Sequence, residues 1–415
     1  MQKRTKDVLF VHTNFPGQFG FIAQALKDRG WRCAAIASQT GRALGGIPLL
    51  RWQTPRGSTS GIFPPAARAE NNLIRGRAAA ECALALQRQG FDPDLIIGHP
   101  GWGETLLLKE IFPRARQILY GEFYFRTRGV DVGFDPEFGQ PSIEERFRIY
   151  AKNATIALAF AEADRIVCPT PFQASLLPKA FRSRTILIHE GVDTDRVRPG
   201  PTATLTLDDG RVLDRSVPVI TFINRQFEPL RGFHIFMRAL PRVLAELPDA
   251  HAVLIGADEP ARYGMAAPNG ATWKGHLLPE VAGRLDMSRV HFTGRVPYDR
   301  MLAALSISAA HVYYTYPFVL SWSLLEAMAC ECLVIGSDTA PVRDAVEHDV
   351  NGLLLDFFDV DALAQALVAA CRQPDRFSPL RKAARRTILD GFDRKRQCEP
   401  AWLRLVDDVL SEERE

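Results

Sequence analysis

Short apolar runs alternate with amphipathic segments along most of the chain. The run at 8–11 is followed by a Pro/Gly turn, by apolar positions at helical spacing over 20–30, and by a second apolar run at 32–38. Apolar runs recur at 95–99, 117–122, 165–170 and 185–190, with a helical pattern at 105–112. Continuous apolar runs separated by helices predict a parallel sheet that helices cover on both faces.

The alternation stops at 199–217, where Pro, Gly and Asp accumulate without a helical period, and we predict a linker or an extra loop there. Strand-like runs then resume at 219–223, 251–256, 290–294, 311–315 and 333–337. We therefore predict an α/β protein with two Rossmann-like, doubly wound domains, at 1–198 and 218–385, and a C-terminal helix within 386–415 that returns to the first domain. Ligands of such sheets bind at the carboxyl ends of the strands, which predicts a cleft between the two domains.

Composition narrows the class of protein. The chain has 415 residues with 51 Lys+Arg and 48 Asp+Glu, so its net charge of +3 argues against a dedicated nucleic-acid binder. The seven cysteines form no secreted-type framework or convincing zinc pattern, which favours buried free thiols. The N-terminal segment lacks the apolar core of a signal peptide, and no apolar run reaches about 20 residues, so we expect a cytoplasmic protein.

Basic runs lie at 179–184, 381–386 and 393–396. They are typical of solvated helix faces, and the alternative is a peripheral contact with an anionic membrane or acceptor. The D-x-D triplets at 92–94, 193–195 and 359–361 fall in turns or at helix starts, so we expect no metal site.

Three glycine-marked turns follow strands in the sequence. Gly17 and Gly20 suit either a tight turn or the approach of a phosphate to a helix N-terminus. The turn at 101–103 imitates a dinucleotide fingerprint, but Leu106 replaces the third glycine, which disfavours NAD. His99 ends the strand before that turn, and structural and functional roles are both open for it.

Two candidate sites lie in the second half. Asn224 ends a strand, and Arg225 and Arg231 follow it, which suits bidentate binding of a diphosphate; ion pairs with Glu228 are the alternative. Glu326 stands three residues after Ser323, the spacing of a capping box, yet a carboxylate at this sheet edge could instead bind ribose hydroxyls.

Several of these segments resemble family 4 of the retaining nucleotide-sugar glycosyltransferases. The stretch 326–355 is similar to the family block that runs from E-A-M-A to N-G-L-L, and 359–367 is similar to its closing helix. The segment 222–233 resembles the diphosphate clamp, and 189–199 resembles the N-G-V-D loop. The stretches 14–20, 94–104 and 122–138 look like one bacterial branch of the family, associated with glycan biosynthesis.

The resemblance implies a GT-B fold and metal-independent transfer of a sugar, with retention, from a nucleoside diphosphate sugar to an acceptor. It implies that Arg225 and Arg231 hold the diphosphate, that Glu326 binds ribose, and that His99 hydrogen-bonds the donor sugar. The turn Gly294–Arg295 would lie by the base, and Gly17 and Gly20 would face the phosphates.

Three residues depart from the family pattern. Phe318 stands where the family has the first Glu of its E-x7-E motif, Arg231 replaces a lysine one residue further on, and Asn224 replaces a glycine. We expect Phe318 to favour a donor with an apolar or deoxy face, or one whose hydroxyls meet the backbone at Val319, Leu320, Ser321 and Ser323. The alternatives to a transferase are a nucleotide-sugar binding or scaffold protein and a sugar-nucleotide epimerase.

Overall fold

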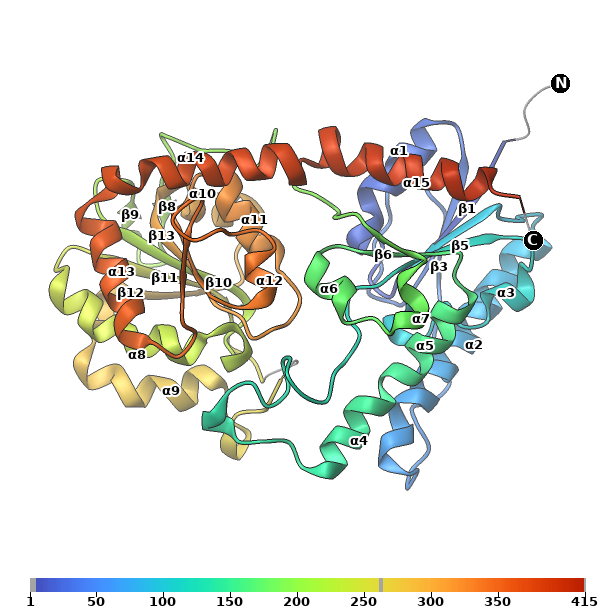
Figure 1. The fold of residues 1–415 in the computed structure, drawn as a ribbon, viewed down its shortest axis with the longest axis horizontal. Helices are drawn as coiled ribbons and strands as arrows, with labels where there is room; N and C mark the ends of the chain where they lie inside the picture. Colours follow the sequence, from blue (N-terminus) through green and yellow to red (C-terminus); the bar gives the residue numbers. More distant parts are fainter. Residues whose placement is uncertain (1–4, 261–263, 414–415) are drawn as a thin grey trace. The chain divides into compact units, whose positions relative to one another are not determined.

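The computed structural model describes residues 5–260 and 264–413. These residues form two compact units, one of Met1–Gly191 with Lys395–Glu415 and the other of Val192–Arg394, which we call the N-terminal and C-terminal units (Figure 1). Each unit contains its own parallel sheet.

The N-terminal unit is built on seven strands in the order β3-β2-β1-β4-β5-β6-β7, all paired in parallel. The strand order reverses between β1 and β4, which makes the carboxyl ends of these two strands the topological switch point of the sheet. The strands are β1 Asp7–Val11, β2 Arg32–Ala37, β3 Leu49–Arg51, β4 Leu95–Gly98, β5 Arg116–Tyr120, β6 Arg165–Cys168 and β7 Thr185–Leu187.

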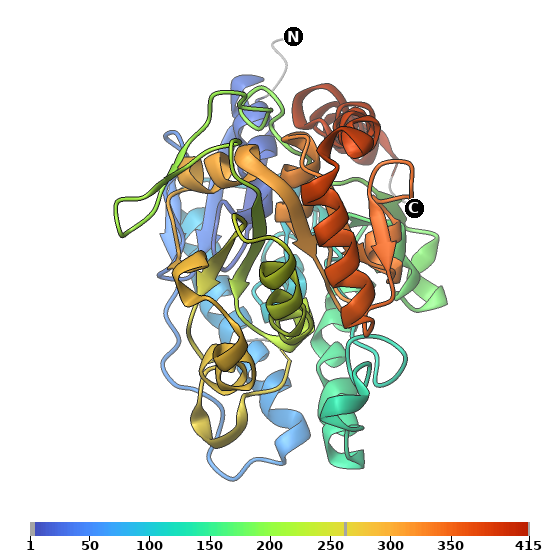
Figure 2. The ribbon, with the colours of Figure 1, turned by 90° about the vertical axis from the view of Figure 1, so that its left-hand side faces the viewer.

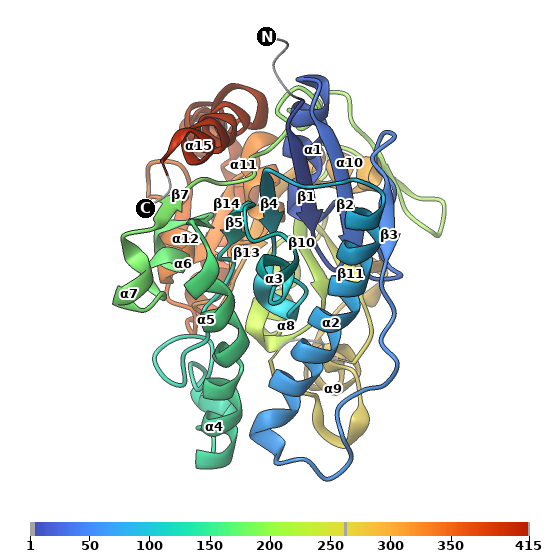
Figure 3. The same cartoon turned by 90° about the vertical axis from the view of Figure 1, so that its right-hand side faces the viewer.

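Alternating residues of β1 face two different helical layers. Val8 and Phe10 pack in a cluster with α1 (Gly20–Asp28) and α15 (Glu399–Ser411). Leu9 and Val11 pack on the opposite face with α2 (Ala67–Arg88) and α3 (Leu108–Ile111), while α5 (Asn153–Glu162) covers β5 and β6 on that same face (Figure 3). The remaining helices are η1 Gly17–Phe19, η2 Pro64–Ala66, η3 Pro100–Trp102, η4 Pro136–Phe138, α4 Ile143–Ala151, α6 Pro171–Ser175 and α7 Lys179–Arg182.

The C-terminal unit contains six parallel strands in the order β12-β11-β10-β13-β14-β15, with its switch point between β10 and β13. The strands are β10 Val219–Gln226, β11 His251–Ala257, β12 Val290–Gly294, β13 Ser308–Tyr313, β14 Val334–Ser337 and β15 Leu353–Leu355. A small antiparallel hairpin, β8 (Leu205–Thr206) with β9 (Val212–Leu213), precedes them.

Helices cover both faces of this second sheet. α8 (Phe233–Glu246) and α13 (Val360–Arg372) lie side by side (Figure 2), and Phe236 of α8 stacks on Phe222 of β10 at 5.0 Å. The opposite cluster joins α10 (Tyr298–Ile307), α11 (Trp322–Ala329) and α14 (Ser378–Thr387) to Val219 and Ile223. The other helices are η5 Pro229–Arg231, η6 Pro268–Gly270, α9 Trp273–Val281, η7 Ala282–Arg284, η8 Met287–Arg289, α12 Ala340–Arg343, η9 Pro374–Phe377 and η10 Ile388–Phe392. The short helix η11, Arg394–Cys398, lies at the boundary and belongs to the N-terminal unit from Lys395 on.

The two predicted doubly wound parallel sheets are confirmed, while the extents of several segments differ from prediction. The segment 199–217 belongs to the C-terminal unit, because Leu205, Leu207 and Leu213 are buried in its core. Residues 386–394 also belong to that unit, where Ile388 is buried, and only 395–415 join the first one. The helical pattern at 105–112 forms a helix only over Leu108–Ile111.

All seven cysteines are free, as predicted, and five are buried while Cys82 and Cys371 are half-buried. Among the described residues, no helix is both long and apolar enough to cross a membrane.

Candidate functional site

The carboxyl end of β10 presents an arginine without a partner. Arg225 is exposed and makes no hydrogen bond or ion pair with any residue that the structure describes. The pairing of β10 with β11 shifts register between Ile223 and Gln226, which shows that the strand is irregular where Asn224 and Arg225 lie. This guanidinium is therefore available to a ligand at the switch point of the C-terminal sheet.

Arg231 lies on the turn that links β10 to α8. Gly232 follows it with a φ of +72°, and a Cβ at Gly232 would come within 2.3 Å of Tyr314 Cβ, so this position requires glycine. Nη1 of Arg231 donates to Thr315 Oγ1 and to the carbonyl oxygen of Val319, both at 2.9 Å. The turn and the two hydrogen bonds fix the guanidinium at the carboxyl end of β13.

Neither arginine is neutralised by a neighbouring acid. In the described ranges, Arg225 and Arg231 form no ion pair with Glu228 or with any other carboxylate, so the Glu228 alternative is excluded in this structure. Two unpaired guanidiniums at one sheet edge create a positive site suited to phosphate oxygens.

Phe318 packs against this site. The guanidinium carbon of Arg231 lies 5.5 Å from the centroid of the Phe318 ring, and the side chain of Phe318 is only 8% exposed. The ring therefore supports Arg231 and leaves little apolar surface for a sugar.

The loop after Phe318 carries the other predicted contacts. The N–H of Ser321 donates to Tyr313 Oη at 2.8 Å, and the hydroxyls of Ser321 and Ser323 lie 2.7 Å apart. Leu320 is buried, and the carbonyl of Val319 is occupied by Arg231. The backbone groups of 319 and 321 are thus bound within the unit.

Glu326 does not form the capping box that its spacing suggested. Helix α11 begins at Trp322 after Ser321, and no side chain caps it. Glu326 Oε1 instead accepts a hydrogen bond from Tyr298 Oη at 2.6 Å. Burial raises the pKa of Glu326, and the hydrogen bond from Tyr298 opposes that shift. The carboxylate is held at the site by a residue 28 positions earlier in the chain.

The turn after β12 is stabilised by an exposed ion pair. Gly294 has a φ of +65°, and Arg295 pairs with Glu259 at 2.9 Å. Gly294 and Arg295 were predicted to lie by the nucleotide base, and that role stays a prediction.

In the N-terminal unit, Gly17 lies against the ring of His12. Gly17 has a φ of +47°, and a Cβ there would approach His12 Cε1 to 2.6 Å, so only glycine fits. Gly20, the first residue of α1, has an ordinary helical φ of −56°. A Cβ added there would lie 3.3 Å from its nearest neighbouring atom. Gly17 is therefore the residue that lets the chain pass close to the switch point of this sheet.

His99 is held by contacts on both ring nitrogens. Its Nδ1 accepts from the N–H of Gly101 at 3.1 Å, and its Nε2 lies 3.3 Å from Glu122 Oε2. The ring stacks on Trp102 with centroids 4.5 Å apart, and only 4% of the residue is exposed. Since Nδ1 accepts, the proton lies on Nε2 and faces Glu122.

A hydrogen-bond chain connects His12 to the same carboxylate. His12 Nδ1 accepts from the N–H of Asn14, so Nε2 carries the proton and donates to Gln18 Oε1, both at 2.8 Å. Gln18 Nε2 then donates to Glu122 Oε1 at 3.0 Å. Burial and the nearby His99 lower the pKa of His12 to about 3, which keeps the ring neutral. Burial raises the pKa of Glu122, but the contact with His99 outweighs burial and lowers it, so the carboxylate stays ionised.

The turn at 101–103 does not form a dinucleotide site. β4 is followed by a single 3-10 turn, Pro100–Trp102, and the next helix, α3, has four residues, so no long helix points its N-terminus at the turn. Gly103 serves packing, because a Cβ there would lie 2.1 Å from Asn72 O. The disfavoured NAD interpretation thus lacks its structural basis.

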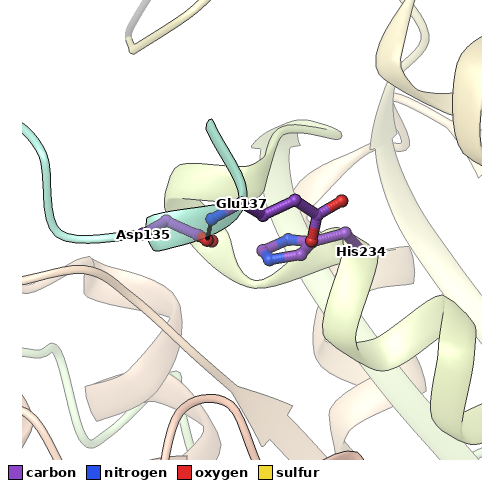
Figure 4. Close-up of side chains that lie close together, drawn as sticks. All are labelled: Asp135, Glu137 and His234. Carbon is purple, nitrogen blue, oxygen red and sulfur yellow. Dashed lines mark hydrogen bonds between the residues drawn. The ribbon is translucent and has the colours of Figure 1, made fainter. Parts of the chain in front are cut away.

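Asp135 caps the N-terminus of η4 in the N-terminal unit, where its Oδ1 accepts from the N–H of Glu137 at 2.9 Å (Figure 4). His234, also drawn there, lies in the first turn of α8 in the C-terminal unit. The expectation of no metal site stays a prediction.

Most of the predicted residues thus fall into two groups, one in each unit near the switch point of its sheet, whereas Gly294 and Arg295 follow the edge strand β12. Sequence reasoning missed five residues that hold them and did not predict the contact of Glu122 with His99; the five are Tyr298, Tyr313, Thr315, His12 and Gln18. Their one signal was position, since His12, Glu122, Tyr313 and Thr315 lie at or just after the carboxyl ends of predicted strands.

Family models match both units. A model described as "Glycosyl transferase family 4 group" covers residues 29–197, and a model described as "Glycosyl transferases group 1" covers 217–373. The chain belongs to the family 4 glycosyltransferases. Apart from 14–20, the segments whose motifs pointed to that family lie wholly or largely within these two matches.

Two curated relatives of this glycosyltransferase family carry the same name. The D-inositol 3-phosphate glycosyltransferase of Mycolicibacterium paratuberculosis is 32% identical over 219 residues, which is 51% of this chain and 46% of the relative. That of Rhodococcus jostii is 27% identical over 230 residues, 54% of this chain and 49% of the relative. The matched region thus spans about half the length of these relatives.

Solved structures share the whole fold. Sucrose-phosphate synthase from Thermosynechococcus elongatus superimposes with a TM-score of 0.72 at 16% identity, covering 98% of this chain and 99% of that one. Anabaena Alr3699/HepE, in complex with UDP and glucose, gives a TM-score of 0.66 at 16% identity, again covering 98% and 99%. The family 4 chain therefore has the GT-B fold.

Proposed function

We propose that this chain is an active retaining glycosyltransferase that moves a sugar from a nucleoside diphosphate sugar to an acceptor without a metal ion. The observation that carries the proposal is the pair of unpaired arginines, Arg225 and Arg231, at the carboxyl end of the C-terminal sheet. When the sugar–phosphate bond breaks, negative charge develops on the β-phosphate, and fixed guanidiniums stabilise that charge. Alr3699/HepE, which shares the fold, has been captured with UDP and glucose, which supports a donor of this class.

The bond changes in the proposed reaction balance without an enzyme nucleophile. The acceptor hydroxyl attacks the anomeric carbon from the face that the diphosphate leaves, and the sugar–phosphate bond breaks with its electron pair on the β-phosphate oxygen. That oxygen takes the proton of the acceptor hydroxyl, so the product keeps its anomeric configuration. Glu326, held by Tyr298, binds the ribose hydroxyls of the nucleotide.

In the N-terminal unit, we assign a sugar-binding role to His99 and Glu122 together. The ring nitrogens of His99 already face Gly101 and Glu122, whereas the Glu122 side chain is 35% exposed. An ionised carboxylate with exposed surface can accept hydrogen bonds from sugar or acceptor hydroxyls while it orients the imidazole.

The experiment is a panel of nucleotide sugars tested for hydrolysis, for transfer and for a rise in melting temperature. D-inositol 3-phosphate belongs among the acceptors, because curated relatives are named for it. Arg225→Ala and Arg231→Ala should each weaken nucleoside diphosphate binding by about one to two orders of magnitude, and Arg284→Ala, an exposed arginine on η7, should not. Unchanged affinity in both folded clamp variants contradicts the assignment.

A binding or scaffold role is the second candidate, because Phe318 replaces an expected carboxylate. The same panel separates the two: a scaffold protein binds a nucleotide sugar but neither hydrolyses nor transfers it. NMR of the donor incubated alone detects an epimerase by the appearance of a second sugar configuration.

A further inference from the structure

A charged cavity lies in the C-terminal unit at the amino ends of its central strands. Its volume is about 470 Å³, within the range of small-molecule sites, and its lining includes Pro218, just before β10, and Ser308, the first residue of β13. β10 ends at Gln226, so Arg225 lies at the other end of this strand. The cavity is therefore separate from the proposed diphosphate clamp.

Three cationic side chains line the cavity: Arg215, Arg381 and Lys382. Arg215 donates through Nε to the carbonyl of Ser306 at 2.9 Å, and both of its Nη atoms lack a hydrogen-bond partner among the described residues. Arg381 is held by its Nη2, which donates to the carbonyl of Ala309 at 2.7 Å. Its Nε is buried and has no partner in the part of the chain that the structure describes.

The cavity also contains two carboxylates, from Glu331 and Asp375, that do not neutralise these cations. Neither forms an ion pair with Arg215 or Arg381 in the described ranges, although acids and bases line the same space. Burial lowers the pKa of Arg381, and the charge of Arg215 lowers it further. The two guanidiniums thus face one cavity without a counter-ion.

We propose that this cavity binds the phosphomonoester of a small polyhydroxylated molecule, that is, a sugar phosphate or a polyol phosphate. Arg215 and Arg381 hold the phosphate, since planar guanidiniums match its oxygens and a phosphomonoester is close to a dianion at neutral pH. Glu331 and Asp375 accept hydrogen bonds from the hydroxyls of the same molecule.

The charges that line the cavity favour a sugar phosphate or polyol phosphate over a ligand that carries only anionic groups. Three cations against two carboxylates leave one net positive charge in the lining, which disfavours an all-anionic ligand such as a polycarboxylate beside Glu331 and Asp375. A ligand with phosphate at one end and hydroxyls at the other satisfies both kinds of side chain.

Hydrogen–deuterium exchange on the full chain locates the site, with glucose 6-phosphate as probe and inorganic phosphate and glucose as comparisons. We expect glucose 6-phosphate to protect 306–309 and 371–382, inorganic phosphate to bind there more weakly, and glucose to give no protection. No protection in these segments, or protection confined to 224–232, overturns the proposal. Equal affinity for inorganic phosphate overturns the role of the hydroxyls.

Calorimetry with three variants tests the residues. Arg215→Gln and Arg381→Gln should each weaken glucose 6-phosphate binding about tenfold or more, and Arg386→Gln, an exposed arginine on the same helix α14, should leave it unchanged. Arg215 is exposed, so its variant stays informative if Arg381→Gln fails to fold. Unchanged affinity in Arg215→Gln, or an equal loss in the Arg386 control, contradicts the proposal.

Discussion

The guanidinium of Arg231 rests on the ring of Phe318, 5.5 Å from its centroid. This contact gives Phe318 a role that its position in the family motif did not suggest. An aromatic ring beneath a guanidinium attracts it without neutralising its charge, so the arginine keeps its full attraction for an anion. Phe318 is therefore better described as a support for Arg231 than as a surface for the donor sugar.

Substitution of Phe318 tests that relationship. Phe318→Leu keeps an apolar side chain and loses the cation–π contact, worth about 0.5–1 kcal/mol, so nucleoside diphosphate affinity should fall a few fold. Phe318→Glu places a carboxylate against Arg231, and the resulting ion pair competes with the diphosphate, so affinity should fall further. Calorimetry checks both, with Phe358→Leu at an exposed phenylalanine as control. If Phe318→Glu binds a nucleotide sugar more tightly than wild type does, without a matching gain for the nucleoside diphosphate, the position contacts the sugar after all.

Glu326→Gln should make the stability of the protein less sensitive to a rise in pH above about 4.3. Burial raises the folded-state pKa of Glu326 above the value of about 4.3 in an unfolded chain, so the folded state keeps a proton that the unfolded state has released. The free energy of unfolding therefore falls as pH rises through this window, and a neutral glutamine removes the loss.

Melting temperatures between pH 4 and 8 measure the effect, with Tyr298→Phe as the companion variant. Loss of the Tyr298 hydrogen bond leaves the buried carboxylate less satisfied, so Tyr298→Phe should be less stable than wild type at neutral pH. A glutamine variant that melts below wild type at neutral pH would mean that the ionised carboxylate stabilises the fold.

His12 should make stability fall in acid. Its pKa is about 3 in the folded protein against an ordinary 6.5, so below pH 6.5 the unfolded chain binds a proton that the folded chain does not. The free energy of unfolding should lose about 1.4 kcal/mol for each pH unit between 6.5 and 3 through this group. Urea titrations of His12→Asn should show a shallower pH dependence, and His276→Asn, at an exposed histidine, should keep the wild-type slope. Identical slopes in all three proteins would remove His12 as the cause.

Trp402 should be essential to the N-terminal unit. It is 1% exposed, and it packs on Phe21 of α1 with ring centroids 6.4 Å apart. Trp402→Ala should lower the free energy of unfolding by about 3–5 kcal/mol. The substitution removes the buried indole and leaves an empty cavity where α15 packs against α1 and the sheet. Trp322→Ala, at an exposed tryptophan, is the matched control, and circular dichroism in denaturant measures both. Equal midpoints for the two variants would show that α15 contributes little to this unit.

Local patterns predicted the strands because β1, β4, β10 and β13 are apolar on both faces, which is what a covered parallel sheet requires. The hairpin near 205–213 was missed because Leu205, Leu207 and Leu213 stand among turn-forming residues, and only the folded core shows that they are buried. Residue type and position along the chain predicted the candidate site residues, but they did not predict which residues contact them. Tyr298 with Glu326 and His99 with Glu122 are contacts between distant segments, which no local spacing encodes.

Helix α15 completes the N-terminal unit from the far end of the chain, after the whole C-terminal unit in sequence. On the ribosome, residues 7–191 therefore emerge long before residues 399–411. Until then α1 is the only one of the two helices that can pack against Val8 and Phe10. The C-terminal unit is continuous in sequence and can fold as soon as its last residues leave the exit tunnel. During synthesis all residues of the second unit are thus available before those that complete the N-terminal unit.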